Sequence, residues 1–162
     1  MKGIDPLAKI VPRDRAAELR RAHAGETMVF TNGCFDLLHV GHVRYLRAAR
    51  ALGDILVVGL NGDASVRRLK GPRRPLHPES ARAEVLAALS AVDHVIIFAE
   101  PRVTALLREV RPDVYVKGGD YTLETLDPEE LATVQRLGAR VELIPAVPGF
   151  STTDVIRKIA EA

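Results

Sequence analysis

Short apolar runs alternate along this chain with longer segments in which apolar residues recur at helical spacing. Five runs are rich in strand-forming residues and predict β-strands, over residues 27–31, 54–60, 94–98, 113–117 and 140–144. The second run is apolar over almost its whole length, which is typical of a strand buried on both faces of a sheet.

The segments with helical spacing predict six helices, over residues 14–23, 40–52, 82–89, 103–111, 128–137 and 152–160. Gly53 and Gly138 follow the second and the fifth of these helices, and Ser151 is suited to cap the last one. Between two of the helices, residues 70–80 hold one glycine and three prolines, so this segment is expected to be an irregular loop. Loops of that length in a compact domain are often functional.

Strands that alternate with helices predict an α/β fold, a doubly wound five-stranded parallel sheet with helices on both faces, as in Rossmann-like proteins. We expect residues 27–162 to form this domain and residues 1–26 to form a helical extension that packs on the domain or on a partner. In such folds ligands bind at the carboxyl ends of the strands, where the strand order reverses. Residues that directly follow strands are therefore the candidates for function.

Composition narrows the function classes. The 162 residues carry a net charge of +2 and no tryptophan, so we expect neither a nucleic-acid partner nor a stacking platform for single strands. A basic cluster over residues 67–74 would suit a small anion, although charge alone favours a solvated surface. With one cysteine, no apolar signal segment and no membrane-length apolar run, the chain is expected to be cytoplasmic, with no membrane partner.

The first cluster of chemically interesting residues follows the first predicted strand, from Thr31 to His42. A strand, a glycine turn and a helix start form a natural phosphate site, because the free N–H groups of the first helical turn favour an anion. His39 and His42 lie three residues apart and therefore share one face of that helix end. Their spacing alone also fits ordinary polar residues near a helix start, or a zinc site with further ligands.

Two other classes of function stay open at this stage. Cys34 lies in the same loop as the histidines, and could act as a nucleophile with one of them as its base. A non-catalytic module that only binds a nucleotide would also fit the fold, since one fold serves many functions. The dinucleotide fingerprint and the P-loop are both absent from the sequence.

The segment from Phe35 to His42 resembles the F-D-x-x-H-x-G-H signature of the cytidylyltransferase-like nucleotidyltransferases. A second element, Ser151-Thr152-Thr153, is similar to the I-S-T-T element with which this superfamily holds the distal phosphates of a nucleoside triphosphate. Alone, Ser-Thr-Thr would be taken as a helix cap. Together the two motifs imply an enzyme that transfers a nucleoside monophosphate and releases pyrophosphate.

Three longer segments, residues 57–71, 117–121 and 149–153, resemble the heptose 1-phosphate adenylyltransferase branch, which makes ADP-heptose for bacterial surface polysaccharide. The resemblance implies transfer of AMP from ATP to a sugar 1-phosphate by a free-standing form of this domain. Glycerol-3-phosphate cytidylyltransferases instead carry R-T-E-G-I-S-T-T at the last motif, and their arginine is absent here. The missing arginine argues against the cytidylyltransferase alternative without excluding it.

The resemblance also assigns roles to residues. His39 and His42 would bind the α- and β-phosphates and Lys70 would close over them on a flexible loop, unless it is a solvated surface lysine. Asp36 would orient a histidine or lie near a metal. The whole expected nucleotide site, besides these catalytic residues, is Thr31, Asn32, Gly33, Phe35, Asp36, Gly41, Lys117, Gly118, Gly119, Asp120, Ser151, Thr152 and Thr153.

The acceptor is expected to contact Asn61, Asp63, Arg82 and Tyr121. Asn61 and Asp63 also make good turn residues, and Arg82 could instead lie on a helix surface. The expected cofactor is Mg²⁺, bound mainly through the ATP phosphates and water, with no metal ligand assigned to the protein. The expected partners are ATP and a sugar phosphate, and a homodimer is expected because the family often forms dimers.

Overall fold

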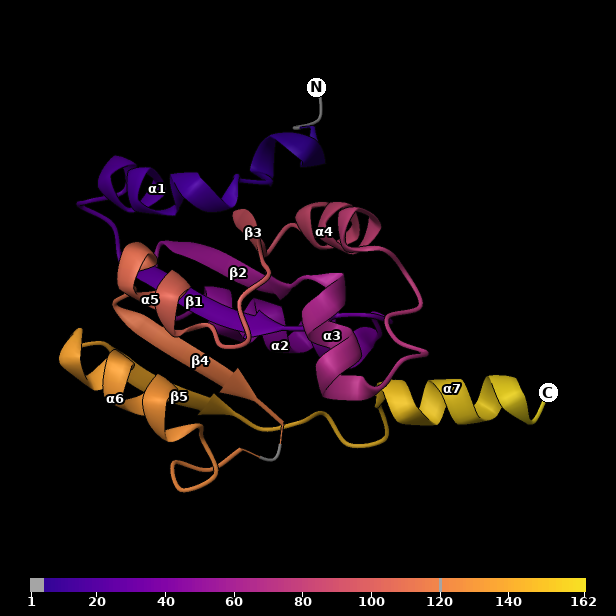
Figure 1. Ribbon diagram of the computed structural model, residues 1–162. Coiled ribbons are helices and arrows are strands. Elements are labelled where there is room, and N and C mark those ends of the chain that lie inside the picture. Colours follow the sequence, from indigo (N-terminus) through magenta and orange to yellow (C-terminus); the bar gives the residue numbers. More distant parts are fainter. Residues whose placement is uncertain (1–4, 120) are drawn as a thin grey trace.

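A computed structural model describes residues 5–119 and 121–162. Its centre is a five-stranded parallel sheet in the order β3-β2-β1-β4-β5 (Figure 1). The strands span Met28–Gly33 (β1), Ile55–Asn61 (β2), His94–Phe98 (β3), Val114–Gly118 (β4) and Arg140–Ile144 (β5). All five predicted strands are confirmed, and so is the doubly wound α/β fold.

Helices connect the strands and extend both ends of the chain. Short 3₁₀ turns span Pro6–Lys9 (η1) and Arg13–Arg15 (η2). The α-helices span Ala16–Ala22 (α1), Val40–Arg50 (α2), Asp63–Lys70 (α3), Glu79–Ala87 (α4), Thr104–Val110 (α5), Pro128–Arg136 (α6) and Thr152–Ala160 (α7). The six predicted helices are present, although α4 begins three residues before the expected start at residue 82.

The sequence prediction missed α3. Four of its eight residues are charged, so the apolar periodicity is weak, and only Ser65 and Val66 are buried. The expected loop at residues 70–80 therefore begins one residue later than predicted, after Lys70, and ends where α4 starts at Glu79. The helix forms because tertiary packing of its short buried face stabilises it, although its sequence has little helical periodicity of apolar residues.

Strand side chains alternate between two cores, one on each face of the sheet. Met28 and Phe30 of β1 pack with α1, α5 and α6 through residues such as Leu106. Val29 and Leu56 point to the other face and pack against Leu46 of α2 and against α4. The helices α2 and α6 therefore lie on opposite faces of the same sheet, and a site at the strand ends can be lined from both faces.

The N-terminal extension packs on this domain. Ile10 forms a parallel bridge with Val95 of β3, and Leu19 of α1 is part of the core beneath α5. Arg13 is paired with both Glu100 (2.6 Å) and Glu109 (2.7 Å). Of the two expected positions, on the domain or on a partner, the described residues of the extension occupy the first.

The strand order reverses next to β1. The chain runs from β1 to β2 and β3 on one side of the sheet, and then returns to place β4 on the other side of β1. The loops that follow β1 and β4 therefore run to opposite faces of the sheet. A crevice opens between them at the carboxyl ends of these two strands. At the end of the chain, α7 projects away from the sheet (Figure 1), and none of its residues is buried. No described helix is both long and apolar enough to cross a membrane.

Candidate active site

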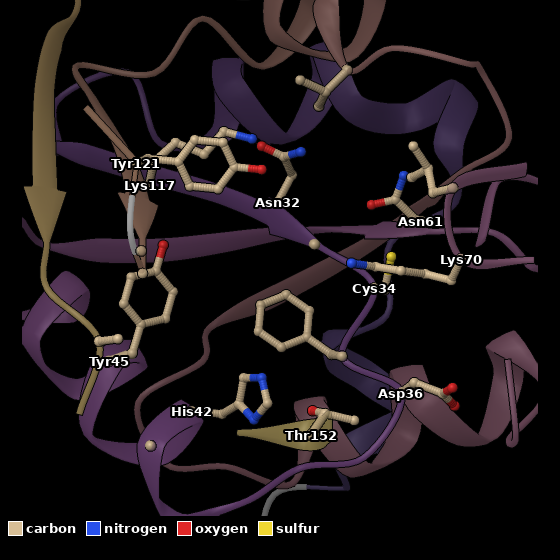
Figure 2. A pocket seen from close by; sticks show the side chains of 18 of the residues that line it. Asn32, Cys34, Asp36, His42, Tyr45, Asn61, Lys70, Lys117, Tyr121 and Thr152 are labelled. Atoms are coloured by element: carbon tan, nitrogen blue, oxygen red, sulfur yellow. The ribbon is translucent and has the colours of Figure 1, made fainter. Parts of the chain in front are cut away.

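A cavity of about 730 Å³ occupies the crevice at the carboxyl ends of the strands (Figure 2). One side is formed by the loop after β1, the start of α2, the segment after β5 and the start of α7. The other side is formed by the end of β3, the loop that follows it, and the start of α6. The cavity therefore runs across the edge of the sheet from the α2 face to the α6 face.

His39 and His42 lie together at the N-terminus of α2, and both line the cavity. Their ring centroids are 3.9 Å apart. His39 is the N-cap residue, and its Nδ1 accepts a hydrogen bond from the Gly41 N–H (3.1 Å). Nδ1 of His42 in turn accepts from the backbone N–H of His39 (3.3 Å). The two histidines of the motif thus cap the N-terminus of α2 reciprocally, since each ring accepts a backbone N–H of that turn.

These hydrogen bonds and the burial of the rings set their charge and tautomer. Burial lowers the pKa of His39, and burial together with the neighbouring His39 ring lowers the pKa of His42 to about 4. Both imidazoles are therefore neutral near pH 7. Because Nδ1 accepts a backbone N–H in each ring, the proton resides on Nε2. The pair offers two fixed N–H donors and no base.

Glycines allow two close approaches around this pair. A Cβ on Gly41 would lie 2.8 Å from ring atoms of His39, so the cap requires glycine there. A Cβ on Gly118, at the end of β4, would lie 2.5 Å from the ring of Tyr45. Two of the predicted nucleotide-binding glycines, Gly41 and Gly118, thus have a packing role, whereas a Cβ on Gly119 would meet nothing within 4 Å.

Tyr45 holds α2 against β4, and the sequence analysis did not single it out. Its hydroxyl bonds the Thr31 hydroxyl (2.6 Å) and donates to the Val116 carbonyl (3.3 Å). Burial raises the pKa of Tyr45 to about 12, which keeps the phenol protonated. Thr31 is fully buried behind Tyr45 and does not line the cavity. Its side chain supports Tyr45, and the nucleotide contact expected from backbone N–H groups near Thr31 stays a prediction. Tyr45 follows His42 by three residues, a spacing that could have revealed it.

The start of α7 faces the histidines. Thr152 and Thr153 line the cavity, and the Thr152 hydroxyl donates to the Leu37 carbonyl (3.3 Å), which ties α7 to the loop before α2 (Figure 2). The Ser151 hydroxyl accepts from the N–H of Asp154 (3.0 Å) and donates to its carboxylate (2.7 Å). Ser151 is thus a helix cap that lies outside the cavity lining, which corrects its expected role as a phosphate ligand.

Asp36 organises the loop after α3, and its partners among the described residues do not include His39 or His42. Its carboxylate accepts from Arg74 Nε (2.6 Å) and from the backbone N–H groups of Leu76 (2.8 Å) and His77 (3.2 Å). Burial would raise the pKa of Asp36, but these three donors outweigh it and hold the pKa below its usual range. The expectation that Asp36 orients His39 or His42 is therefore wrong, and its expected place near a metal stays a prediction.

The same loop brings positive charge to the cavity. Arg74, held by Asp36, lines it, and so does Lys70. Lys70 is the last residue of α3, which corrects its expected place on a flexible loop. In Figure 2 its side chain reaches past Cys34 across the cavity.

The segment after β4 lines the cavity as expected. Lys117 is buried, pairs with Glu130 (3.2 Å), and lies 5.3 Å from the ring of Tyr121. Gly119 has a φ of +91°, a left-handed conformation in which glycine is favoured. The prediction for Asp120 lies outside the described residues.

Arg82 has a structural role, which makes both of its expected roles wrong. It is 2% exposed and lies outside the cavity lining. Its guanidinium donates to the carbonyls of His77, Cys34 and Asn61 and to the carboxylate of Asp63 (3.0, 2.7, 2.8 and 2.7 Å). Asp63 is accordingly a partner of Arg82 and does not reach the cavity either. Asn61 lines the cavity as expected, with its amide bonded to Ser65 (3.0 Å).

Cys34 does not have the environment of a nucleophile. Burial raises the pKa of its thiol, although Lys70 and Arg82 partly oppose the shift. A thiol attacks as the thiolate, so a raised pKa removes the reactive form at neutral pH. The structure therefore disfavours the cysteine alternative.

The cavity brings together most of the predicted residues. Those that line it are Asn32, Gly33, Phe35, Asp36, His39, Gly41, His42, Asn61, Lys70, Lys117, Gly118, Gly119, Tyr121, Thr152 and Thr153. It adds residues that the sequence analysis did not name as candidates, including Tyr45, Asp127 and Glu130, and it includes Arg74 of the basic cluster that was expected to suit a small anion. Within the described residues, no group of three or more His, Cys, Asp or Glu side chains could hold a metal ion. The site thus offers hydrogen-bond donors and positive charge to an anion.

Comparison with known proteins adds an independent finding. A family model described as cytidylyltransferase-like matches residues 30–158. Proteins named "Bifunctional protein HldE" are similar to this chain: that of Syntrophotalea carbinolica is 59% identical over 137 residues, covering 85% of this chain and 28% of that protein. That of Geobacter sulfurreducens is 51% identical over 162 residues, covering 100% of this chain and 31% of that protein. The chain thus spans about a third of the length of these relatives.

Solved structures give the same picture. A lipopolysaccharide core biosynthesis protein from Thermoplasma volcanium is 33% identical with a TM-score of 0.63, over 76% of this chain and 98% of that one. A pantoate-beta-alanine ligase from Francisella tularensis, complexed with an ATP analogue and beta-alanine, has a TM-score of 0.60 over 94% of this chain and 78% of that one. At 15% identity the second likeness shows the fold alone.

Proposed function

This chain belongs to the cytidylyltransferase-like family, and from that premise we propose that it is an adenylyltransferase that transfers AMP from ATP to heptose 1-phosphate. The products are ADP-heptose and pyrophosphate. The proposal for the acceptor draws on the resemblance of residues 57–71, 117–121 and 149–153 to that branch. The similar Thermoplasma volcanium protein is named for lipopolysaccharide core biosynthesis, which agrees with it.

The observation that carries the proposal is the pair of neutral, closely packed imidazoles, tilted by 39° to one another, beside the start of α7. Two Nε2–H donors and a helix N-terminus face one cavity, and both kinds of group favour phosphate oxygens. Neutral donors bind developing negative charge without acting as bases. That arrangement suits phosphoryl transfer, in which positioning and charge stabilisation supply most of the rate.

In the proposed reaction, an oxygen of the sugar phosphate attacks the α-phosphorus of ATP. A new oxygen–phosphorus bond forms as the bond between the α-phosphorus and the bridging β-phosphate oxygen breaks, and pyrophosphate leaves with the electron pair. His39 and His42 donate to the α- and β-phosphate oxygens, where charge accumulates. The N-terminus of α7, with Thr152 and Thr153, holds the β- and γ-phosphates, and Lys70 and Arg74 balance the charge of the departing pyrophosphate.

We propose Mg²⁺ as the cofactor, held by the triphosphate oxygens and water, where it neutralises charge on the leaving group. In this proposal the ion arrives with ATP, and no residue of the protein is assigned as its ligand. A homodimer in the cytoplasm is also proposed. Light scattering during gel filtration measures the oligomeric state directly.

The test is pyrophosphate release in the presence of Mg²⁺, with ATP and CTP each combined with heptose 1-phosphate and glycerol 3-phosphate. We expect release with ATP and heptose 1-phosphate. Release with CTP and glycerol 3-phosphate would assign the chain to the cytidylyltransferase branch instead. Binding of ATP without release from any pair would favour a nucleotide-binding module.

A further inference from the structure

Three carboxylates among the described residues line the cavity, and two of them are fully used by the protein. Both oxygens of Asp36 accept from the loop after α3. Asp127 caps α6 through Oδ1, which accepts from the N–H groups of Glu129 (2.9 Å) and Glu130 (3.1 Å), and its Oδ2 lies 3.3 Å from Arg102. Each oxygen of these two carboxylates thus already has a partner within the protein.

Glu130, in the first turn of α6, is different. Its Oε2 lies 3.2 Å from Lys117 Nζ and accepts from the Tyr115 hydroxyl (2.8 Å), whereas its Oε1 has no hydrogen bond within residues 5–119 and 121–162. The side chain is 12% exposed and lines the cavity. One oxygen is thus fixed by the protein and the other is left for a ligand.

The partners of Glu130 hold it rigidly. Tyr115 is fully buried, and burial together with Glu130 raises the pKa of its phenol, so the proton stays on the phenol and is available to the carboxylate. The same hydroxyl lies 2.9 Å from Asn32 Oδ1, and its single proton can serve only one of the two oxygens at a time. Lys117 offsets the charge of Glu130, which reduces its repulsion of a phosphorylated ligand.

The two sides of the cavity differ in the ligand that they suit. Beyond the histidines, the wall consists of Pro145, Ala146, Val147 and Phe150, an apolar surface against which a flat base can pack. The α6 side instead presents Glu130, Lys117 and Asn32, a carboxylate, an ammonium and an amide. A polyhydroxylated ring needs hydrogen-bond partners of this kind.

We propose that Glu130 is the specificity-determining residue for the acceptor, accepting through Oε1 a hydrogen bond from a ring or side-chain hydroxyl of the sugar phosphate. The inference rests on the proposed function, because it places the sugar on the α6 side while its phosphate faces the histidines. Lys117 and Tyr115 are positioning residues that hold the carboxylate in place.

Glu130→Gln is the main test, with Glu129→Gln as the matched control. Glu129 is the preceding residue of α6, and its side chain is 64% exposed and outside the cavity lining. For Glu130→Gln we expect KM for heptose 1-phosphate to rise by about 10- to 100-fold, the range for losing a charge-assisted hydrogen bond. KM for ATP and the folded circular-dichroism spectrum should not change. The control variant should match wild type in both KM values.

A structural defect is separated from recognition by crossing both proteins with monodeoxy analogues of the sugar phosphate. For the analogue that lacks the recognised hydroxyl, wild type should lose about as much kcat/KM as Glu130→Gln loses with the full substrate, while the variant should lose almost nothing more. Equal losses in both proteins for every analogue would overturn the proposal.

Direct titration of heptose 1-phosphate by calorimetry keeps this inference separate from the proposed activity. Wild type that turns over, with an unchanged KM for the sugar phosphate in Glu130→Gln, would overturn the inference and leave the function standing. Wild type that binds the sugar phosphate without turnover, and loses binding in Glu130→Gln, would overturn the function and support the subsite. Absence of sugar phosphate binding by wild type would overturn both.

Discussion

The histidine pair at the start of α2 and the Arg82 junction use polar side chains in opposite ways. The Arg82 junction is Arg82 with its partners His77, Cys34, Asn61 and Asp63. Arg82 directs its guanidinium at three carbonyls and one carboxylate inside the protein. His39 and His42 each accept a backbone N–H at Nδ1, and within residues 5–119 and 121–162 their Nε2 atoms have no hydrogen-bond partner, which leaves them available to a ligand. A polar residue near a strand end is therefore a binding residue when a donor or acceptor is left over, and a structural residue when none is.

The sharpest contrast is expected from Arg82→Ala. Removing this guanidinium leaves Asp63 and three carbonyls without their donor in a buried place, and we expect the free energy of unfolding to fall by about 3–5 kcal/mol. Urea denaturation followed by circular dichroism measures the change. Arg47→Ala, at an exposed position of α2, is the control and should change it by less than about 0.5 kcal/mol.

If Arg82→Ala does not fold, Arg82→Lys keeps the charge but loses the planar fork, and should be less stable than wild type while still folded. A stable Arg82→Ala variant with a raised KM for the sugar phosphate would contradict the structural role. It would return Arg82 to the acceptor site.

His42→Ala should give the opposite result. Loss of one donor to the developing phosphate charge is expected to lower kcat by about 10²- to 10³-fold. The free energy of unfolding should fall by about 1 kcal/mol, because only one cap hydrogen bond is lost. Pyrophosphate release and urea denaturation measure the two effects. A large loss of stability with unchanged kcat would mean that the ring only caps α2.

Sequence reasoning identified the histidine end of the site but not the Arg82 junction. His39, His42 and Thr152 follow strands at positions where a parallel sheet places its ligands, but the spacing alone left their roles open, and the resemblance to the family motifs singled them out. Three of the four partners of Arg82 are 19 to 48 residues away in the chain, and the partners of Asp36 are 38 to 41 residues away, so no local pattern encodes them. Which polar groups are satisfied internally depends on the tertiary structure.

The same reasoning explains the misses in the fold and on the α6 side. Strands and most helices were predictable because buried apolar positions repeat with the period of each element. The helix α3 was missed because its surface is charged and its buried face is short. In the sequence, Glu130 is an acidic residue in the first turn of a helix. Acidic residues are common there because they interact favourably with the helix dipole. Only its contact with Lys117, seen in the structure, distinguishes it.

Gly118→Ala tests the junction between α2 and β4 that supports the histidine end. The new Cβ would lie 2.5 Å from Tyr45, whose hydroxyl is held by Thr31 and Val116, so the ring cannot move freely. We expect a loss of about 1–3 kcal/mol in the free energy of unfolding, measured by urea denaturation. Gly25→Ala has nothing within 4 Å of its Cβ and serves as the control. Equal stability of both variants would mean that α2 can shift away from β4.

The neutrality of the histidines can be tested by titration. His42 should titrate near pH 4 in ¹⁵N NMR of the imidazole ring, well below the ordinary value of 6.5, and should show the Nε2–H tautomer above that pH. Its folded pKa lies below the unfolded value, so its contribution to stability is complete above about pH 6.5 and is lost as the pH falls toward 4. A pKa near 6.5 would show a solvated ring and would weaken the assignment of neutral donors.

The smallest effect is expected for Cys34→Ser, although Cys34 lies in the same loop as the histidines. Burial raises the pKa of its thiol, so little thiolate exists at neutral pH to act as a nucleophile. In direct displacement at phosphorus no covalent enzyme intermediate forms, and kcat should stay within about twofold of wild type, since the change is smaller than any loss of a phosphate donor. Pyrophosphate release measures kcat, and mass spectrometry of the enzyme quenched during turnover should show no added AMP. A hundredfold loss of kcat together with an AMP adduct on the wild-type protein would overturn the role of the histidines as phosphate donors and make one of them the base for a cysteine nucleophile.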